Sequence, residues 1–322
     1  MNQQKTTTSS YSGIFMLTLC SFIWGTAFIA QSLGGQIMGP MTFNGSRSIL
    51  ASLFLLPAIF LFDRLNGRRC GFWGTDDPAQ RKKLWRGGII CGLVLTIDSL
   101  FQQTGMMYTS VGKGGFITSL YIVIVPLLAR FIFGRRVNIF QGIGVLIACI
   151  GMYFICLNES FSINKGDLFI LGSAFFFAVH ILSVEHFAPG VDGVRLSFFQ
   201  FSTCAAINLV LMFIFEQPTV LQLQQALLPV CYAGIMSSGI AYTLQIVGQK
   251  RVNVVLATIL LSLESVFALL SGWLFLHQVL SGKEIFGCVL VFAAIMLAQL
   301  PPSLVGIRET EHIEAKKVEH AQ

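Results

Sequence analysis

The sequence predicts an all-α integral membrane protein of about ten transmembrane helices. Of its 322 residues, 54% are hydrophobic and only 11% are charged, and the mean hydropathy is +0.74. A soluble domain carries about 25% charged residues to cover its surface. The apolar residues form blocks of the length that a helix needs to cross a bilayer, and the basic residues gather in alternate joints between them.

Apolar blocks separated by short polar joints fill the chain. They cover residues 12–33, 40–62, 86–107, 112–133, 138–157, 166–186, 194–215, 225–247, 253–275 and 282–301. A single block fits a buried helix of a soluble core, but ten in series indicate a membrane bundle. The first block is long for the core of a signal peptide, so we interpret it as a span. The charged tail, residues 306–322, is expected to be cytoplasmic and without fixed structure.

The distribution of lysine and arginine along the chain indicates its orientation in the membrane. With the N-terminus inside, 17 of the 21 basic residues fall in cytoplasmic segments and only Lys165 and Lys283 fall in outer loops, while Arg47 and Lys113 lie in or at spans. This distribution follows the positive-inside rule, and an even number of spans puts both termini in the cytoplasm. We therefore expect a multi-pass protein of the plasma membrane (a bacterial inner membrane), whose net charge of +6 requires no nucleic-acid partner.

The two halves of the chain match at constant offsets. At a shift of 153 residues, Trp24-Gly25-Thr26 falls on Phe177-Ala178-Val179 and Arg47 falls on Gln200. Beyond the basic loop the shift is 143 and pairs Gln102 with Gln245, Gly105 with Gly248, Ser119 with Ser262, Leu120 with Leu263, Tyr121 with Glu264 and Gly144 with Gly287. Each half (12–157 and 166–301) holds five spans. Because five is an odd number, the second half is expected to be inverted in the membrane relative to the first. Inverted repeats with a midplane site between them are typical of secondary transporters.

Several motifs in chain order resemble one family. They are Phe22-Ile23-Trp24-Gly25-Thr26-Ala27-Phe28; Gln102-Gln103-Thr104-Gly105; Lys113-Gly114-Gly115-Phe116-Ile117-Thr118; Leu120-Tyr121 with Val125-Pro126-Leu127; Gly239-Ile240-Ala241-Tyr242-Thr243-Leu244-Gln245; Gly248-Gln249-Lys250; and Leu263-Glu264-Ser265-Val266-Phe267-Ala268. Over nearly the whole chain they resemble the drug/metabolite transporter superfamily, EamA type. The resemblance implies two EamA-like five-helix repeats that transport amino acids, metabolites, sugars or drugs.

The chain departs from that family's pattern at two places. The family usually has a proline after the ninth-helix glutamate, where this chain has Ser265. It often ends the fourth and ninth helices with a Gly-Glu pair, where this chain has Gly134-Arg135 and His277-Gln278. Any role of those edge glutamates therefore does not carry over.

Two carboxylates lie deep in predicted spans. Glu264 is about eleven residues into the ninth span, and Asp98 is similarly deep in the third. A charge at the bilayer centre costs about 2.5–3.5 kcal/mol on insertion scales, so each requires a reason. Either they line a polar cavity and bind a solute or a proton, or they hold helices together by hydrogen bonds.

Helical spacing places further polar residues beside them. Asp98, Gln102 and Gly105 share one helix face, and the matching stripe in the second half is Tyr242, Gln245 and Gly248. We expect the two stripes to face each other across a central path. Plain interhelical packing is the alternative.

The remaining candidates are Arg47, Lys113, Trp24, Tyr121 and His180. Arg47 either snorkels to the headgroups or pairs with an intramembrane carboxylate or an anionic solute group. Lys113 starts the fourth span at the predicted mouth of a cavity. Trp24 and Tyr121 lie at mid-depth rather than in the interfacial belts, so they either line a cavity or pack the core. His180 is a candidate proton-responsive group, although a lone histidine is more often a packing residue.

These features favour a transporter over an enzyme or a receptor. The polar loops are too short for a catalytic domain, and the sequence has no HExxH motif and no phosphate-binding glycine loop. The eight cysteines have neither disulfide-framework nor zinc-ligand spacing. We expect no cofactor or metal, and a secondary or facilitated exporter of a small metabolite, such as an amino acid, working by alternating access. Multidrug efflux is the alternative, and protons are the candidate coupling ion.

Overall fold

The computed structural model describes residues 2–65, 67, 71–109, 111–134, 139–156, 164–276, 281–298 and 300. This part of the chain is helical, with no strand. Its elements are α1 (Asn2–Gly35), α2 (Pro40–Leu65), α3 (Pro78–Met106), α4 (Val111–Thr118), α5 (Tyr121–Phe133), α6 (Ile139–Cys156), α7 (Lys165–Phe187), α8 (Gly193–Phe215), α9 (Val220–Gln225), α10 (Leu227–Cys231), the π-helix η1 (Tyr232–Ala241), α11 (Tyr242–Gln249), α12 (Val254–Leu261), α13 (Leu263–Leu276) and α14 (Gly282–Ala298). His277-Gln278 and the predicted tail 306–322 lie outside the described residues.

Among the described residues, eight helical stretches are long and apolar enough to cross a membrane. They are Tyr11–Gly35, Pro40–Leu65, Pro78–Met106, Val111–Ile132, Lys165–Phe187, Gly193–Phe215, Leu227–Gln249 and Val254–Phe275. Two further apolar stretches, Ile139–Gly151 and Ile285–Leu297, are shorter. Each of the ten predicted blocks thus coincides with an apolar helical stretch, and the all-helical membrane architecture is confirmed. The count of ten spans and the location of the termini stay predictions.

The outside of the bundle is apolar, and its embedded charges point inward. Large side chains such as Phe60, Phe131 and Phe213 are more than half exposed. In water such a surface would be an aggregation hazard, whereas in a bilayer it contacts lipid tails. Asp98 and Glu264, by contrast, are buried.

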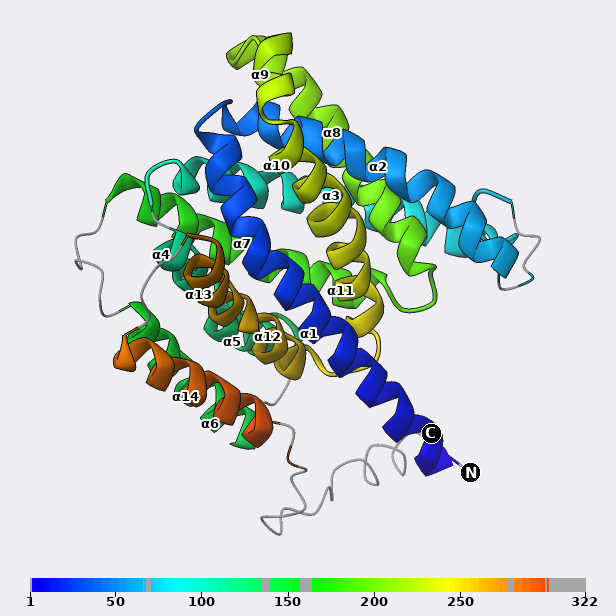
Figure 1. The fold of residues 1–322 in the computed structure, drawn as a ribbon. Coiled ribbons are helices and arrows are strands. Elements are labelled where there is room, and N and C mark those ends of the chain that lie inside the picture. Colours follow the sequence, from blue (N-terminus) through cyan, green and yellow to red (C-terminus); the bar gives the residue numbers. More distant parts are fainter. Residues whose placement is uncertain are drawn as a thin grey trace.

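The helices pack in pairs (Figure 1). α2 packs against α8, α3 against α7, and α1 against α13 and α11, while α6 and α14 lie side by side at one edge of the bundle. The long α1 crosses the middle of the view. The main hydrophobic core lies between α1, α7, α12 and the helices around them.

Glycines permit two close helix crossings that match across the halves. A Cβ added to Gly105 in α3 would lie 2.8 Å from the carbonyl oxygen of Gly166 in α7. A Cβ on Gly248 in α11 would lie 3.3 Å from the carbonyl oxygen of Gly13 in α1. Gly13 and Gly166 are 153 residues apart, and Gly105 and Gly248 are 143 apart. The first span of each half thus crosses the third span of the other at an equivalent glycine pair.

Three of the predicted spans are not continuous α-helices in the described structure. The span 112–133 is divided into α4 and α5 around Ser119, and the span 253–275 into α12 and α13 at Ser262. At these points the backbone tightens, because Ile122 N–H donates to Ser119 and Ser265 N–H donates to Ser262. The span 225–247 contains the π-helix η1, a geometry that is frequent at functional sites.

Candidate functional site

A small internal cavity lies beside the two helix breaks. Thr118, the last residue of α4, and Glu264, in the first turn of α13, both line it. The complete lining is Trp24, Phe28, Gln31, Arg47, Gln102, Thr118, Phe177, Ser237, Tyr242 and Glu264. The cavity volume is about 20 Å³, which is room for about one water molecule. In this structure the cavity is therefore too narrow for a small organic solute.

Aromatic rings form one wall of the cavity. The Trp24 ring lies 4.7 Å from that of Tyr242 and 5.5 Å from that of Phe177, centroid to centroid. The predicted candidate Tyr121 does not line the cavity; it is buried and packs edge-on against Phe177 at 5.0 Å. Trp24 and Phe177 are the residues that the shift of 153 pairs. Such a wall suits a flat or apolar part of a solute.

Glu264 is a buried carboxylate with few partners. Its Oε1 accepts a long hydrogen bond of 3.4 Å from the Ser119 hydroxyl. The Tyr121 hydroxyl lies near it but forms no hydrogen bond in the described structure. Glu264 forms no ion pair within the described part of the chain. A buried carboxylate this weakly satisfied requires a proton, a water or a cationic group.

Arg47 is a buried cation that forms no direct ion pair among the described residues. Its side chain on α2 is only 4% exposed, so it does not snorkel to the headgroups. It forms no ion pair with any residue that the structure describes, and its Nε has no hydrogen-bond partner. Its guanidinium carbon lies 5.9 Å from the Phe43 ring centroid, a weak cation–π contact. Asp98 lies within electrostatic range of the guanidinium, but no described carboxylate pairs with it directly, so an anionic solute group has room to do so.

Asp98 is held by a neighbouring helix. Its Oδ1 accepts a 2.6 Å hydrogen bond from Ser173 of α7, and Arg47 is within electrostatic range. The structure thus places Asp98 at the α3–α7 contact behind the cavity, while Gln102, one turn further along α3, lines it.

The two predicted polar stripes do not face each other as whole surfaces. In each stripe one residue lines the cavity, Gln102 in the first and Tyr242 in the second. The glycines at their ends pack against other helices, Gly105 on α7 and Gly248 on α1. The stripes are divided because the neighbouring helix changes along the length of α3 and of α11. The same helix face therefore lines the cavity at one residue and packs against another helix at the glycine.

Two other predicted candidates are buried near the cavity without lining it. Nε2 of His180 lies 3.1 Å from Oε1 of Gln200, and the imidazole stacks on Phe177. Neither amide atom of Gln245 finds a hydrogen-bond partner in the described structure. Buried polar atoms are normally satisfied. Water or a bound solute would have to supply partners for Gln245.

Lys113 belongs to a structural contact away from the cavity. Its Nζ lies 2.7 Å from Oδ2 of Asp167, which also accepts the backbone N–H of Asn164 in the capping box of α7. Thr109 donates to the other oxygen of Asp167. This network joins the start of α4 to the start of α7.

The cavity also contains residues that the sequence argument did not select. Gln31, Thr118, Ser237, Phe28 and Phe177 all line it. Phe177 was detectable, because the repeat aligns it with Trp24. Phe28 and Thr118 lie in the motifs that resemble the family, but nothing marked them out within those motifs, and no sequence pattern distinguished Gln31 or Ser237. No cluster of His, Cys, Asp or Glu suited to a metal occurs among the described residues.

Ser265 occupies the position where the resemblance led us to expect proline. Its backbone N–H and its hydroxyl both donate to the Ser262 carbonyl, at 3.2 and 2.8 Å. The serine therefore supports the helix break by hydrogen bonds that a proline could not make.

Proteins similar in sequence to this chain are named as transporters. An uncharacterized transporter of Archaeoglobus fulgidus is 27% identical over 285 residues, covering 88% of this chain and 84% of that protein. The uncharacterized transporter YoaV of Bacillus subtilis is 24% identical over 298 residues, covering 88% and 94%. A solved crystal structure superimposes with a TM-score of 0.71 at 21% identity, covering 91% of this chain and 96% of the other, which shows a common fold.

The family comparison matches almost the whole chain. The model of the EamA-like transporter family matches residues 11–157 and again residues 164–300. This confirms the resemblance to the drug/metabolite transporter superfamily, EamA type. The chain is a multi-pass membrane protein that belongs to the EamA-like transporter family.

Proposed function

We propose that this protein exports a small zwitterionic solute, such as an amino acid, across the plasma membrane by alternating access. The observation that carries the proposal is the charge arrangement of the cavity. Two buried groups line the same space: Arg47, which has no direct ion pair among the described residues, and Glu264, a weakly satisfied carboxylate. A solute that bears both a carboxylate and an ammonium group complements both charges.

The aromatic wall adds a preference for the rest of the solute. An apolar or aromatic side chain would pack against the wall formed by Trp24, Phe177 and Tyr242. Multidrug efflux is the second candidate, favoured by the same wall. A zwitterion makes better use of the charged groups, which would cost free energy against an apolar drug.

The positions of the helix breaks support alternating access. The helix breaks occur at equivalent places, since α4 ends at Thr118 and α12 ends at Leu261, 143 residues later. Interrupted helices in corresponding positions of two halves point to the solute site of inverted-repeat transporters. We place both termini in the cytoplasm, following the distribution of lysine and arginine. Glu264, with Asp98 as the second candidate, is the group that would exchange a proton for the solute.

The test is uptake in proteoliposomes. The purified protein would be offered each of the twenty radiolabelled amino acids, with and without an imposed pH gradient. Arg47→Gln should abolish flux of the accepted solute. Arg130→Gln is the matched control, because it removes the same charge from an exposed position at the end of α5. Transport of none of the twenty, or full flux through Arg47→Gln, would contradict the proposed solute class.

A further inference from the structure

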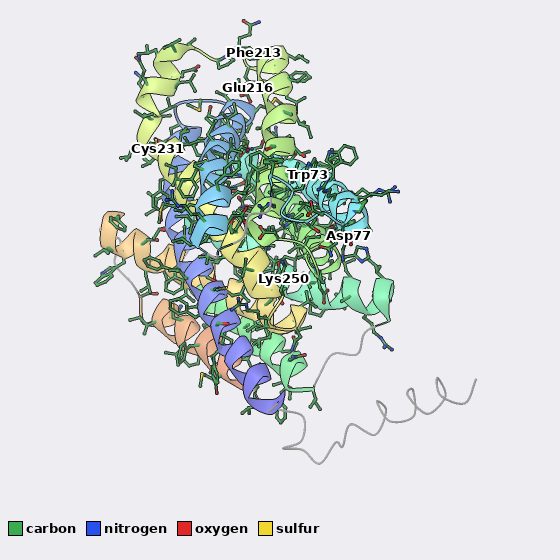
Figure 2. All side chains as sticks on the ribbon, turned by 90° about the vertical axis from the view of Figure 1, so that its right-hand side faces the viewer. Trp73, Asp77, Phe213, Glu216, Cys231 and Lys250 are labelled. Carbon is green, nitrogen blue, oxygen red and sulfur yellow. The ribbon has the colours of Figure 1, made fainter. Side chains whose placement is uncertain are left out.

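Carboxylates fasten the antiparallel helices α2 and α8 together at both ends. At one end the C-terminal turn of α2 meets the start of α8, and at the other the start of α2 meets the end of α8. In Figure 2, Glu216 is labelled near the top of the view, and Trp73 marks the loop at the opposite end of the pair. These contacts lie outside the solute cavity.

The first fastening is a buried ion pair. Nη2 of Arg195 lies 2.5 Å from Oδ2 of Asp63, and Nη1 lies 3.3 Å from Oδ1, so the contact is two-pronged. The Arg195 side chain is only 2% exposed. Its Nε donates to the backbone carbonyl of Phe72 at 2.8 Å, which also holds the α2–α3 loop. A paired, buried arginine of this kind is a strong and specific contact.

Aromatic packing reinforces this end. The Trp73 ring stacks on Phe199 of α8 at 5.5 Å with an interplanar angle of 15°. Phe72 packs edge-on against Phe198 at 5.6 Å. The loop therefore covers the start of α8 and closes this end of the pair.

The second fastening places a carboxylate on a helix N-terminus. Oε1 of Glu216 accepts the backbone N–H of Met41 at 2.9 Å, and Oε2 accepts the N–H and the hydroxyl of Thr42, each at 2.7 Å. The first turn of a helix has unpaired N–H groups and a partial positive charge, so the carboxylate is well placed there.

The two fastenings are equivalent under the internal repeat. Asp63 and Glu216 are 153 residues apart, and so are their partners Thr42 and Arg195. Each carboxylate thus comes from the end of one helix and meets the same position near the start of the other. The ends are separated by about 30 Å along α2, from the rise of 1.5 Å per residue. Near the midpoint, Ser202 donates to Ser52 at 3.4 Å.

We propose that these contacts are two latches that open one at a time. The inner latch is Asp63–Arg195 with the Phe72 carbonyl, and the outer latch is Glu216 with the N-terminus of α2. The inference rests on the proposed alternating access, which requires one end to open while the other stays closed. In this structure both latches are closed and the cavity is too narrow for a solute. Breaking the inner latch opens the cytoplasmic side, and breaking the outer latch opens the external side.

The test measures access to the cavity from each side without any solute. Ser237, which lines the cavity, becomes the single cysteine in a chain whose native cysteines are replaced by serine or alanine. A membrane-impermeant maleimide is applied from one side or the other of oriented vesicles. Asp63→Asn should speed labelling from the cytoplasmic side about tenfold, and Glu216→Gln should do so from the external side, as expected for weakening hydrogen bonds to a charged group. Asp76→Asn is the matched control, because its ion pair with Arg81 is on the surface.

The double variant sharpens the test. Asp63→Asn with Glu216→Gln should show faster labelling from both sides but no rise in passive leak, because the latches never open together. Faster labelling from the same side in both single variants, no change in either, or an equal change in Asp76→Asn would overturn the proposal. Because labelling requires no substrate, a failed amino-acid screen would reject the proposed solute and leave this result standing.

A second measurement keeps the native cysteines. Hydrogen exchange of the chain in nanodiscs should show faster exchange in peptides covering 71–77 for Asp63→Asn, with peptides covering 40–45 unchanged. Glu216→Gln should give the opposite pattern. Faster exchange at both ends in both variants would mean general loss of stability and would contradict separate latches.

Discussion

Arg47 and Arg195 provide a test of whether a buried arginine serves the fold or a ligand. Both are almost fully buried, but Arg195 pairs with Asp63 whereas Arg47 has no ion-pair partner among the residues described. Methionine has a similar length and no charge. We therefore expect Arg47→Met and Arg195→Met to change the free energy of unfolding in opposite directions.

The magnitudes follow from the contacts. A lone arginine within a span costs about 3 kcal/mol on insertion scales, and losing the Phe43 cation–π contact offsets about 1 kcal/mol of that. Arg47→Met should therefore raise stability by about 2 kcal/mol. Arg195→Met leaves the Asp63 carboxylate buried and unpaired, which should lower stability by about 3–5 kcal/mol.

The assay is equilibrium unfolding by titration with SDS in mixed micelles, followed by tryptophan fluorescence. Flux in proteoliposomes is measured beside it, and Arg47→Met should be inactive although it is more stable. Such opposition of stability and activity is typical of functional sites. If Arg47→Met is destabilised as strongly as Arg195→Met, Arg47 has a structural partner and the reasoning on the solute site is refuted.

Three further outcomes are expected. Gly248→Leu should lower stability by about 1–3 kcal/mol by overpacking, because its Cβ would already lie 2.9 Å from the Leu17 side chain; SDS titration measures this, and an unchanged midpoint would contradict the close crossing. Glu264→Gln should reduce flux at least tenfold and remove its dependence on an imposed pH gradient, whereas full gradient-dependent flux would exclude Glu264 from proton exchange. Trp24→Ala should raise the half-saturating solute concentration about tenfold, since it removes the ring against Phe177; an unchanged value would mean that the ring only packs the core.

The membrane architecture could be predicted because it depends on local composition. A block of about 20 apolar residues identifies a span wherever it lies, and the predicted 194–215 is close to the observed Gly193–Phe215. The start of α3 was placed too late, at residue 86 instead of Pro78. Its first turns carry Arg81, Lys82 and Lys83, so hydropathy excluded them, although Asp77 followed by Pro78 is a typical helix start.

The helix breaks could not be predicted in the same way. Apolar residues continue through Ser119 and Ser262, so hydropathy does not change where the backbone hydrogen bonds shift. The repeat aligned the two serines but gave no reason to interrupt a helix there. The π-helix at Tyr232–Ala241 is likewise absent from the sequence pattern, because it depends on how the segment packs against α1 and α2.

The sequence by itself determined which segments enter the membrane and which residues are too polar to be there without a reason. Those conclusions require only the free energy of transferring each side chain into lipid. The tertiary structure alone decided which of the polar residues meet. It placed Arg47 and Glu264 in one cavity, and it paired Lys113 with Asp167 and Asp63 with Arg195. These partners lie far apart along the chain, and the rotation and crossing angle of the helices decide which of them meet.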